Sequence, residues 1–247
     1  AVRARNRGKD RGVDLASTRW VDDPLALATD KEIDLVVETI GGEGGVAKAL
    51  VEKALAAGKP VVTANKALLA HHGLALAKLA EKHHAVLAFE AAVAGGIPII
   101  KALRDGLAAN RISSIAGILN ATCNVILTTM TERKQDLAEV MDEAARLGIL
   151  EADPSLDVDG FDAAHKITIL SSLVFGIAPA LDKVHIEGIR AVQLSDIEFA
   201  AELGYAVKLL AIAARTERGI EQRVHPCLVP KDSAIARTRG ALNAAAI

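Results

Sequence analysis

Before residue 90, the chain alternates short apolar runs with longer segments in which apolar residues recur at helical spacing. Residues 33–38 (IDLVVE), 60–66 (PVVTANK) and 85–89 (AVLAF) have the length and apolar content of buried strands. Residues 46–59 and 68–84, which lie between them, have the spacing of helices. A strand–helix–strand–helix–strand order with short connections predicts right-handed βαβ units around a parallel sheet.

Polar turns follow the first two predicted strands. They are residues 39–42 (TIGG) and 63–66 (TANK). Ligands of parallel α/β sheets bind beyond the carboxyl ends of the strands, so both turns are candidate ligand contacts. The alternative is that these residues do no more than form the turns.

The pattern changes near residue 89. Residues 111–119 alternate like a strand, and a polar turn (NATCN) is predicted at residues 120–124. Further strand-like segments are mixed with a helix predicted at residues 195–204; they are residues 182–189, 205–217 and 222–230.

The predicted fold class is therefore α/β with two domains. Residues 1–88 form an incomplete Rossmann-type parallel sheet, and residues 89–247 form an α+β domain with a mixed sheet.

An acidic stretch precedes the most apolar helix that the pattern predicts. Five acidic residues fall within a dozen positions: Glu151, Asp153, Asp157, Asp159 and Asp162. Pro154 and Gly160 indicate that this stretch is a loop rather than a solvated helix face.

The helix after this loop carries a single lysine, Lys166, four residues after Asp162. The two side chains share one helix face, and the apolar residues that follow place the lysine in an apolar layer. Acids around a poorly hydrated ammonium group are a setting in which pKa values shift for proton transfer. The alternative is an ordinary surface Asp–Lys pair, which is common and weak.

Composition excludes several classes of protein. The chain of 247 residues is 51% hydrophobic and 24% charged with a net charge of −2, as expected for a soluble globular protein that does not bind nucleic acid. Its apolar runs are too short for a membrane span, and no signal peptide is visible. Cys123 and Cys227 cannot by themselves form a disulfide framework or a zinc site, so we expect free thiols in a reducing cytoplasm.

The glycine fingerprint expected of the first βα turn of a dinucleotide-binding domain is absent. We infer from this that the first β–α unit is missing from the sequence. Five basic residues alternate near the beginning of the chain: Arg3, Arg5, Arg7, Lys9 and Arg11. They are either positioned after a second strand, where an arginine would meet the 2′-phosphate of NADP, or they form a frayed basic terminus.

Six segments together resemble the homoserine dehydrogenase family, and they follow one another in order from about residue 33 to residue 230. They are VVETIGG, GKPVVTANKALLAHHG, FEAAVAGGIPIIKAL, GILNATCNVILTTM, LGILEADPSLDVDGFDAAHK and VHPCLVP. The resemblance implies NAD(P)-dependent interconversion of L-homoserine and L-aspartate 4-semialdehyde, in threonine and methionine biosynthesis. It also implies that residues 1–88 are a partial NAD(P)-binding domain and that residues 89–247 are a substrate-binding, catalytic and dimerisation domain.

The resemblance also implies roles for particular residues. Lys166 exchanges the hydroxyl proton of the substrate, Asp162 orients Lys166, and Lys66 reaches substrate and nicotinamide. Glu151 and Asp157 are substrate-side acids. The remaining substrate contacts are Asn120 and Thr122, and the cofactor contacts, besides Lys66, are Ile40, Gly41, Thr63, Asn65, Arg3 and Gly188.

A sodium ion and a partner subunit are implied as well. The carboxylate of Glu90 and the carbonyl groups of Val93, Gly95 and Ile97 would supply the oxygen ligands that hard cations prefer. The alternative is that this glycine-rich turn is a tight domain junction. The resemblance further implies a cytoplasmic homodimer with no membrane contact.

The sequence departs from the family pattern at several places. Ala121 stands where the family usually has glycine, Cys123 lies in the same segment, and Ile149 and Leu150 replace a tyrosine–alanine pair. The chain also lacks the return to the dinucleotide domain, so we expect it to be truncated at both ends. Two alternatives are therefore kept: a related amino-acid dehydrogenase, for example one acting on aspartate, or a catalytically inactive dimerisation module that lacks the cofactor loop.

Overall fold

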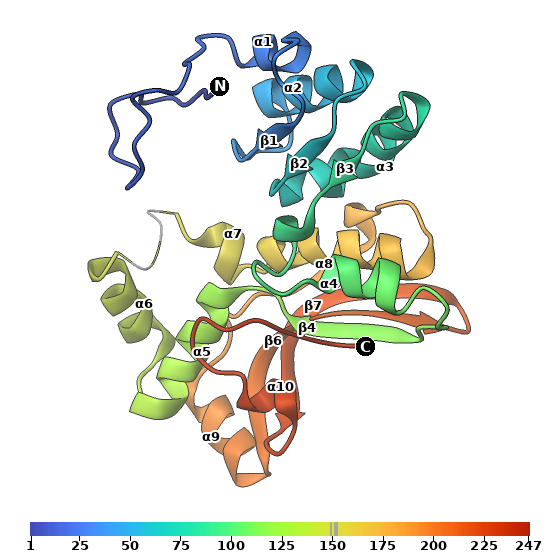
Figure 1. Ribbon diagram of the computed structural model, residues 1–247. Coiled ribbons are helices and arrows are strands. Elements are labelled where there is room, and N and C mark those ends of the chain that lie inside the picture. Colours follow the sequence, from blue (N-terminus) through green and yellow to red (C-terminus); the bar gives the residue numbers. More distant parts are fainter. Residues whose placement is uncertain (149, 151–152) are drawn as a thin grey trace. The chain divides into compact units, whose positions relative to one another are not determined.

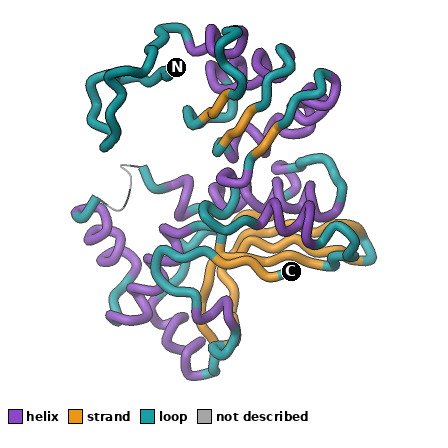
Figure 2. The backbone as a smooth tube through the Cα atoms, in the orientation of Figure 1, coloured by secondary structure: helices purple, strands orange, loops and turns teal. Residues whose placement is uncertain are grey.

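The computed structural model describes residues 1–148, 150 and 153–247. The chain divides into two compact units, Ala1–Ala92 and Val93–Ile247, which are treated separately below. Figures 1 and 2 show the helices and strands of each.

The first unit contains a three-stranded parallel sheet, as the sequence predicted. Strands β1 (Val36–Glu38), β2 (Val61–Thr63) and β3 (Leu87–Ala88) lie side by side in chain order. The register aligns Glu38 with Thr63, so the carboxyl ends of β1 and β2 are level with each other.

Helices connect these strands (Figure 1). Helix α2 (Gly45–Ala56) links β1 to β2, helix α3 (Lys66–Lys82) links β2 to β3, and the short helix α1 (Pro24–Thr29) contacts α2. The apolar positions that predicted α2 are its buried ones: Ala47, Leu50, Val51, Ala54 and Leu55. Removing a leucine side chain from water contributes about 1.5–3 kcal/mol, which fixes α2 on the sheet.

The second unit is built on a five-stranded mixed sheet, which confirms the predicted class. Its strands are β4 (Ser114–Ile118), β5 (His185–Ile186), β6 (Tyr205–Thr216), β7 (Gly219–Pro230) and β8 (Ala244–Ala246). The order is β5-β7-β6-β4-β8, with only the β5–β7 pair parallel.

Helices of the second unit pack beside this sheet (Figure 2). They are α4 (Ile99–Lys101) with the π-helical turn η2 (Ala102–Gly106), α5 (Ala121–Arg133), α6 (Leu137–Arg146), α7 (Ser155–Val158), α8 (Phe161–Phe175), α9 (Leu194–Glu202) and α10 (Ala234–Arg237). Two 3₁₀ turns, η1 (Glu90–Ala92) in the first unit and η3 (Leu181–Lys183) in the second, complete the helical elements. Helix α8 packs on β6 and β7 and buries Ala164, Ile167 and Leu170.

Three predictions of local structure are wrong. Of residues 182–189, which were predicted as a strand, only His185–Ile186 form one (β5), and Leu181–Lys183 form the 3₁₀ turn η3. The segment 120–124 is the beginning of α5 rather than a turn, because the Asn120 side chain caps the helix by accepting a hydrogen bond from the Cys123 amide. Within the acidic stretch, residues 155–158 form the helical turn α7 rather than an irregular loop.

Within the described ranges, no helix has both the length and the apolar character needed to cross a membrane.

Candidate functional site

Lys166 and Asp162 form a largely buried pair in the first turns of α8. The Lys166 ammonium donates to Asp162 Oδ2 and to the carbonyl oxygen of Leu119, both at 2.7 Å. Their side chains are only 15% and 5% exposed. This burial excludes an ordinary surface pair and places the ammonium between a carboxylate and the end of β4.

Asn120 connects this pair to a second carboxylate. Its side-chain amide donates to Asp162 Oδ2 over 2.9 Å and to Asp157 Oδ1 over 2.7 Å. The side-chain oxygen of Asn120 is already engaged as the cap of α5, which directs the amide hydrogens toward the two acids. The β4–α5 junction, α7 and α8 therefore meet at one residue.

Asp157 is held from two further directions. The Thr122 hydroxyl donates to Asp157 Oδ2 over 2.9 Å, and the Cys123 thiol donates to the Asp157 backbone carbonyl over 3.2 Å. Burial, reinforced by the nearby Asp157 and Asp162 carboxylates, raises the pKa of Cys123, so this residue remains a thiol. Cys123 thereby contacts the backbone of Asp157, and the sequence pattern alone did not reveal this contact.

The five acids of the sequence pattern separate in the structure. Asp157 and Asp162 join the cluster around Asn120, whereas Asp159 pairs with the Arg190 guanidinium and Asp153 accepts a hydrogen bond from the Ser155 amide. Glu151, which was expected to bind substrate, lies outside the described residues.

Gly188 is required for close packing against the end of α7. A Cβ atom at this position would lie 2.0 Å from the Val158 carbonyl oxygen and 2.5 Å from Asp159 Cα. The next residue, Ile189, donates its amide hydrogen to the same Val158 oxygen over 2.8 Å. This packing gives a reason for glycine that is independent of the expected cofactor contact.

We expect Gly188→Ala to displace α7 and with it Asp157. Overpacking against backbone atoms costs about 1–3 kcal/mol, so the variant should unfold at a lower temperature and bind substrate more weakly. Thermal unfolding and KM measure the two effects. Gly106→Ala is the matched control, because a Cβ there meets nothing within 4 Å. An unchanged melting temperature and KM in Gly188→Ala would contradict the packing argument.

In the first unit, a buried carboxylate joins the two predicted ligand turns. Glu38, at the end of β1, is fully buried. Its Oε1 accepts hydrogen bonds from the amides of Ile40 (2.7 Å) and Gly41 (3.1 Å), and its Oε2 accepts one from the Thr63 hydroxyl (2.6 Å). Glu38 was not among the residues predicted to belong to a site, although an acid that ends an apolar strand is a usable signal.

Asn65 continues this network. Its side-chain oxygen caps α3 by accepting from the Leu68 amide over 3.0 Å, and its amide donates to the Gly42 carbonyl over 2.8 Å. Lys66 follows as the first residue of α3. The expected cofactor residues Ile40, Gly41, Thr63 and Asn65 are thus held together, and Gly41 has the left-handed φ of +83° that favours glycine.

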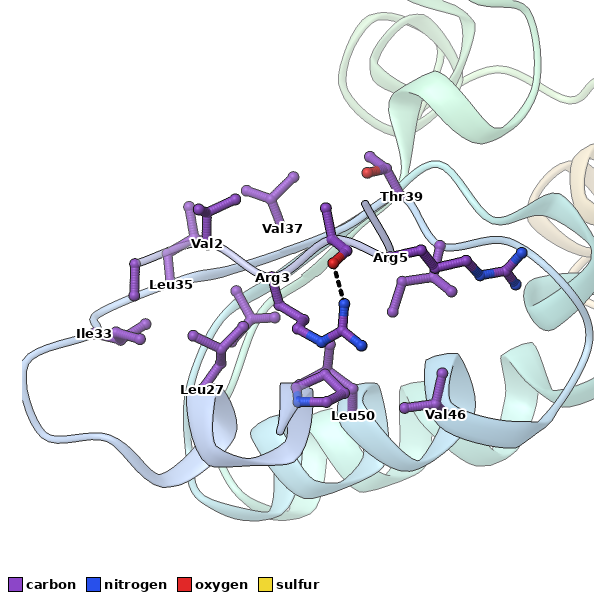
Figure 3. A pocket seen from close by; sticks show the side chains of 15 residues that line it. Val2, Arg3, Arg5, Leu27, Ile33, Leu35, Val37, Thr39, Val46 and Leu50 are labelled. Carbon is purple, nitrogen blue, oxygen red and sulfur yellow. Dashed lines mark hydrogen bonds between the residues drawn. The ribbon is translucent and has the colours of Figure 1, made fainter. Parts of the chain in front are cut away.

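A cavity of about 700 Å³ lies beside β1 in the same unit (Figure 3). Its walls include Arg3 and Arg5, the Thr39–Ile40 turn and the apolar residues Val2, Leu27, Ile33, Leu35, Val37, Val46 and Leu50. Arg3 extends toward Leu50 and donates through Nε to the Asp22 carbonyl over 2.8 Å. Because this volume is within the range of small-molecule sites and its cations suit phosphates, the residues fit part of a dinucleotide.

The four residues expected to bind sodium lie on both sides of the division between the units. Glu90 belongs to the first unit, whereas Val93, Gly95 and Ile97 belong to the second. Gly95 has a left-handed φ of +59°, which turns the chain sharply here. Among the described residues, no group of three or more His, Cys, Asp or Glu side chains could hold a metal ion.

Comparison with known proteins accounts for both units. Residues 98–247 match the family model for homoserine dehydrogenase, and residues 1–90 match the model for the NAD-binding domain of homoserine dehydrogenase. The chain is 52% identical over 228 residues to a homoserine dehydrogenase of Neisseria gonorrhoeae, covering 92% of this chain and 52% of that protein. For the enzyme of Pseudomonas aeruginosa the identity is 51%, with 94% and 53% covered.

Solved structures of homoserine dehydrogenases also superpose well on this chain. The crystal structure of a homoserine dehydrogenase from Thiobacillus denitrificans superposes with a TM-score of 0.90 at 50% identity, covering 93% of this chain and 53% of the other. A hyperthermophilic archaeal homoserine dehydrogenase in complex with NADPH superposes with a TM-score of 0.77 at 32% identity, covering 90% and 64%.

The first unit has parallel strands, helical connections and polar turns at the carboxyl ends of its strands, and these features define a Rossmann-type nucleotide-binding unit. It is followed along the chain by an α+β unit with a buried lysine–aspartate pair. The chain spans about half the length of the curated relatives it matches. It belongs to the homoserine dehydrogenase family.

Proposed function

We propose that the protein is an NAD(P)-dependent homoserine dehydrogenase that interconverts L-homoserine and L-aspartate 4-semialdehyde. The observation that carries this proposal, beside family membership, is the buried cluster of Lys166, Asp162, Asn120 and Asp157. The reaction needs a group that removes the hydroxyl proton when the alcohol is oxidised and returns it when the aldehyde is reduced.

Lys166 is proposed to exchange this proton. The Asp162 carboxylate and the Leu119 carbonyl accept two of its ammonium hydrogens, which fixes the direction of the side chain. An ammonium nitrogen has three hydrogens, so one remains for the substrate oxygen. Asp162 is a positioning residue in this scheme, because it acts through Lys166.

The substrate contacts proposed are Asp157, Asn120, Thr122 and Glu151. Asp157 would attract the amino group of homoserine, and its carboxylate is held for this purpose by Asn120 and Thr122. The site thus combines two carboxylates, those of Asp157 and Asp162, with the Lys166 ammonium. This combination is complementary to homoserine, which carries an ammonium group and a carboxylate.

We propose that the first unit binds the cofactor. The nicotinamide, when bound, accepts or supplies the hydride. Ile40, Gly41, Thr63, Asn65 and Lys66 would contact it at the turns that Glu38 organises.

Arg3 is the residue proposed to select NADP. The arginine lines the cavity beside β1 together with Arg5, and a guanidinium group there suits a 2′-phosphate. We also propose that Gly188, in the second unit, contacts the cofactor.

We propose a cytoplasmic homodimer that serves threonine and methionine biosynthesis, and a structural sodium ion held by Glu90 with the carbonyl groups of Val93, Gly95 and Ile97. Hard cations favour such all-oxygen ligand sets.

The test is an assay of the full-length protein with L-homoserine, L-aspartate and a panel of other amino alcohols, each with NADP and with NAD. We expect NADPH to form with homoserine and not with aspartate. Running the assay in mixtures of sodium and choline salts at constant ionic strength tests the ion, because a bound sodium would make turnover or stability depend on the sodium concentration in a saturable way.

Two results would reject the proposal. Turnover of aspartate in preference to homoserine would favour a related amino-acid dehydrogenase. Failure of the full-length protein to bind NADPH in a fluorescence titration would favour an inactive dimerisation module.

A further inference from the structure

A second cavity, of about 220 Å³, lies in the second unit, apart from the cluster around Lys166. Helix α5, the beginning of β6, the residue after β7 and the segment around α10 supply its walls. The lining residues are Thr128, Thr131, Glu132, Ala206, Lys208, Lys231, Ala236, Arg237 and Arg239.

The charges around this cavity are predominantly positive. Lys208, Lys231, Arg237 and Arg239 supply four cations, whereas Glu132 supplies the one carboxylate. That carboxylate already pairs with the Arg239 guanidinium at 3.1 Å. Like charges gathered in one concave site repel one another, so an anion bound among them would relieve the repulsion.

Lys208 is the most unusual of these residues, because it is only 4% exposed. Its ammonium donates to Asn124 Oδ1 over 2.9 Å and to the Thr238 carbonyl over 2.6 Å. Both acceptors are uncharged, and the nearby Glu132 carboxylate, which favours the charged form of Lys208, is paired with Arg239. A buried ammonium bonded only to neutral acceptors is costly, and this cost is what a bound anion would offset.

The structure holds Lys208 firmly in this position. Its partner Asn124 donates to the carbonyl groups of Thr238 (3.3 Å), Gly240 (2.9 Å) and Leu242 (3.2 Å), which fastens the segment after α10 to α5. The Gly240 amide in turn donates to the Thr128 hydroxyl over 3.1 Å. The cations are therefore presented by packed elements rather than by a loose tail.

We propose that this cavity binds the phosphate group of a small metabolite. Lysine and arginine are the usual cationic ligands of phosphate, and a phosphate offers several oxygens to donors that approach from different sides. Here the donors come from α5, β6, the end of β7 and α10. A carboxylate has a flat pair of oxygens that a single arginine satisfies, so it makes poorer use of this arrangement.

The site has a characteristic dependence on pH. Burial, with a further contribution from Arg239, lowers the pKa of Lys208 to about 8, while Glu132 opposes the shift. Above pH 8 Lys208 loses its charge, whereas Arg237 and Arg239 keep theirs. Lys231 is the remaining cation that faces the cavity. Affinity for phosphate should therefore fall as the pH rises through the Lys208 pKa of about 8.

The experiment is isothermal titration of the full-length protein with inorganic phosphate, methyl phosphate and acetate at constant ionic strength. We expect saturable binding of both phosphates and much weaker binding of acetate. The double variant Lys231→Gln/Arg237→Gln changes two exposed side chains and should fold normally. It should bind phosphate at least about tenfold more weakly, since a hydrogen bond to a charged group contributes about 1.5–3 kcal/mol.

The control variant is Arg146→Gln, which removes an exposed cation of α6 outside the cavity. Its phosphate affinity should equal that of the unaltered protein, and homoserine turnover should be unaffected in both variants. The proposal is overturned if no saturable binding occurs, if acetate binds as tightly as phosphate, or if Arg146→Gln weakens binding as much as the double variant.

Discussion

Replacement of Lys166 by alanine in the full-length protein is expected to lower kcat for homoserine oxidation by about 10²–10⁴-fold, the usual contribution of a general acid–base group. The Lys166 ammonium is largely buried between Asp162 and the Leu119 carbonyl. Alanine leaves no group there that can exchange the proton. NADPH formation monitored by absorbance measures the loss, and thermal unfolding checks that the variant is folded.

The chain offers a matched control in Lys101. It also pairs with an aspartate four residues later, Asp105, but the two side chains are 72% and 62% exposed. Lys101→Ala should therefore keep full activity, since an exposed pair of this spacing contributes little. Normal turnover in Lys166→Ala would refute the assignment of the proton-exchanging residue.

The second large effect is expected from Glu38→Ala, which removes the carboxylate that joins the turns after β1 and β2. The amides of Ile40 and Gly41 and the Thr63 hydroxyl would lose their acceptor. Each buried donor left without a partner costs about 1–3 kcal/mol, so we expect a destabilisation of at least about 3 kcal/mol. Affinity for NADPH should fall at least tenfold, because the loosened turns no longer hold their contacts in place.

Chemical denaturation and a fluorescence titration with NADPH measure these two effects. Glu32→Ala removes another acid of the same unit whose side chain is 81% exposed, and it should change neither quantity. Unaltered stability and NADPH binding in Glu38→Ala would show that the turns do not depend on this carboxylate.

The sequence was sufficient to predict the parts of the fold that depend on local periodicity. Apolar runs identified β1, β2 and β3, and helical spacing identified α2 and α3. The four-residue separation of Asp162 and Lys166 placed both on one face of α8, because that spacing repeats with the helical turn.

The contacts that build the sites join residues far apart in the chain, and spacing alone could not reveal them. Thr63 meets Glu38 across 25 residues, and Asn120 meets Asp162 across 42. Polar residues near a helix start also suggest a turn as readily as a cap, which is why the beginning of α5 was missed. The hydrogen bond from Cys123 to the Asp157 carbonyl depends on the packing of α7 beside α5.

The capping of α5 by Asn120 fixes the orientation of the Asn120 side-chain amide in the cluster around Lys166. A carboxamide can usually exchange its oxygen and nitrogen by a half-turn of the side chain. In Asn120 the oxygen is committed to the Cys123 amide, so the nitrogen must face Asp157 and Asp162. Secondary structure thereby fixes the orientation of the Asn120 carboxamide, so the substrate binding proposed for this cluster requires no rotation of that side chain.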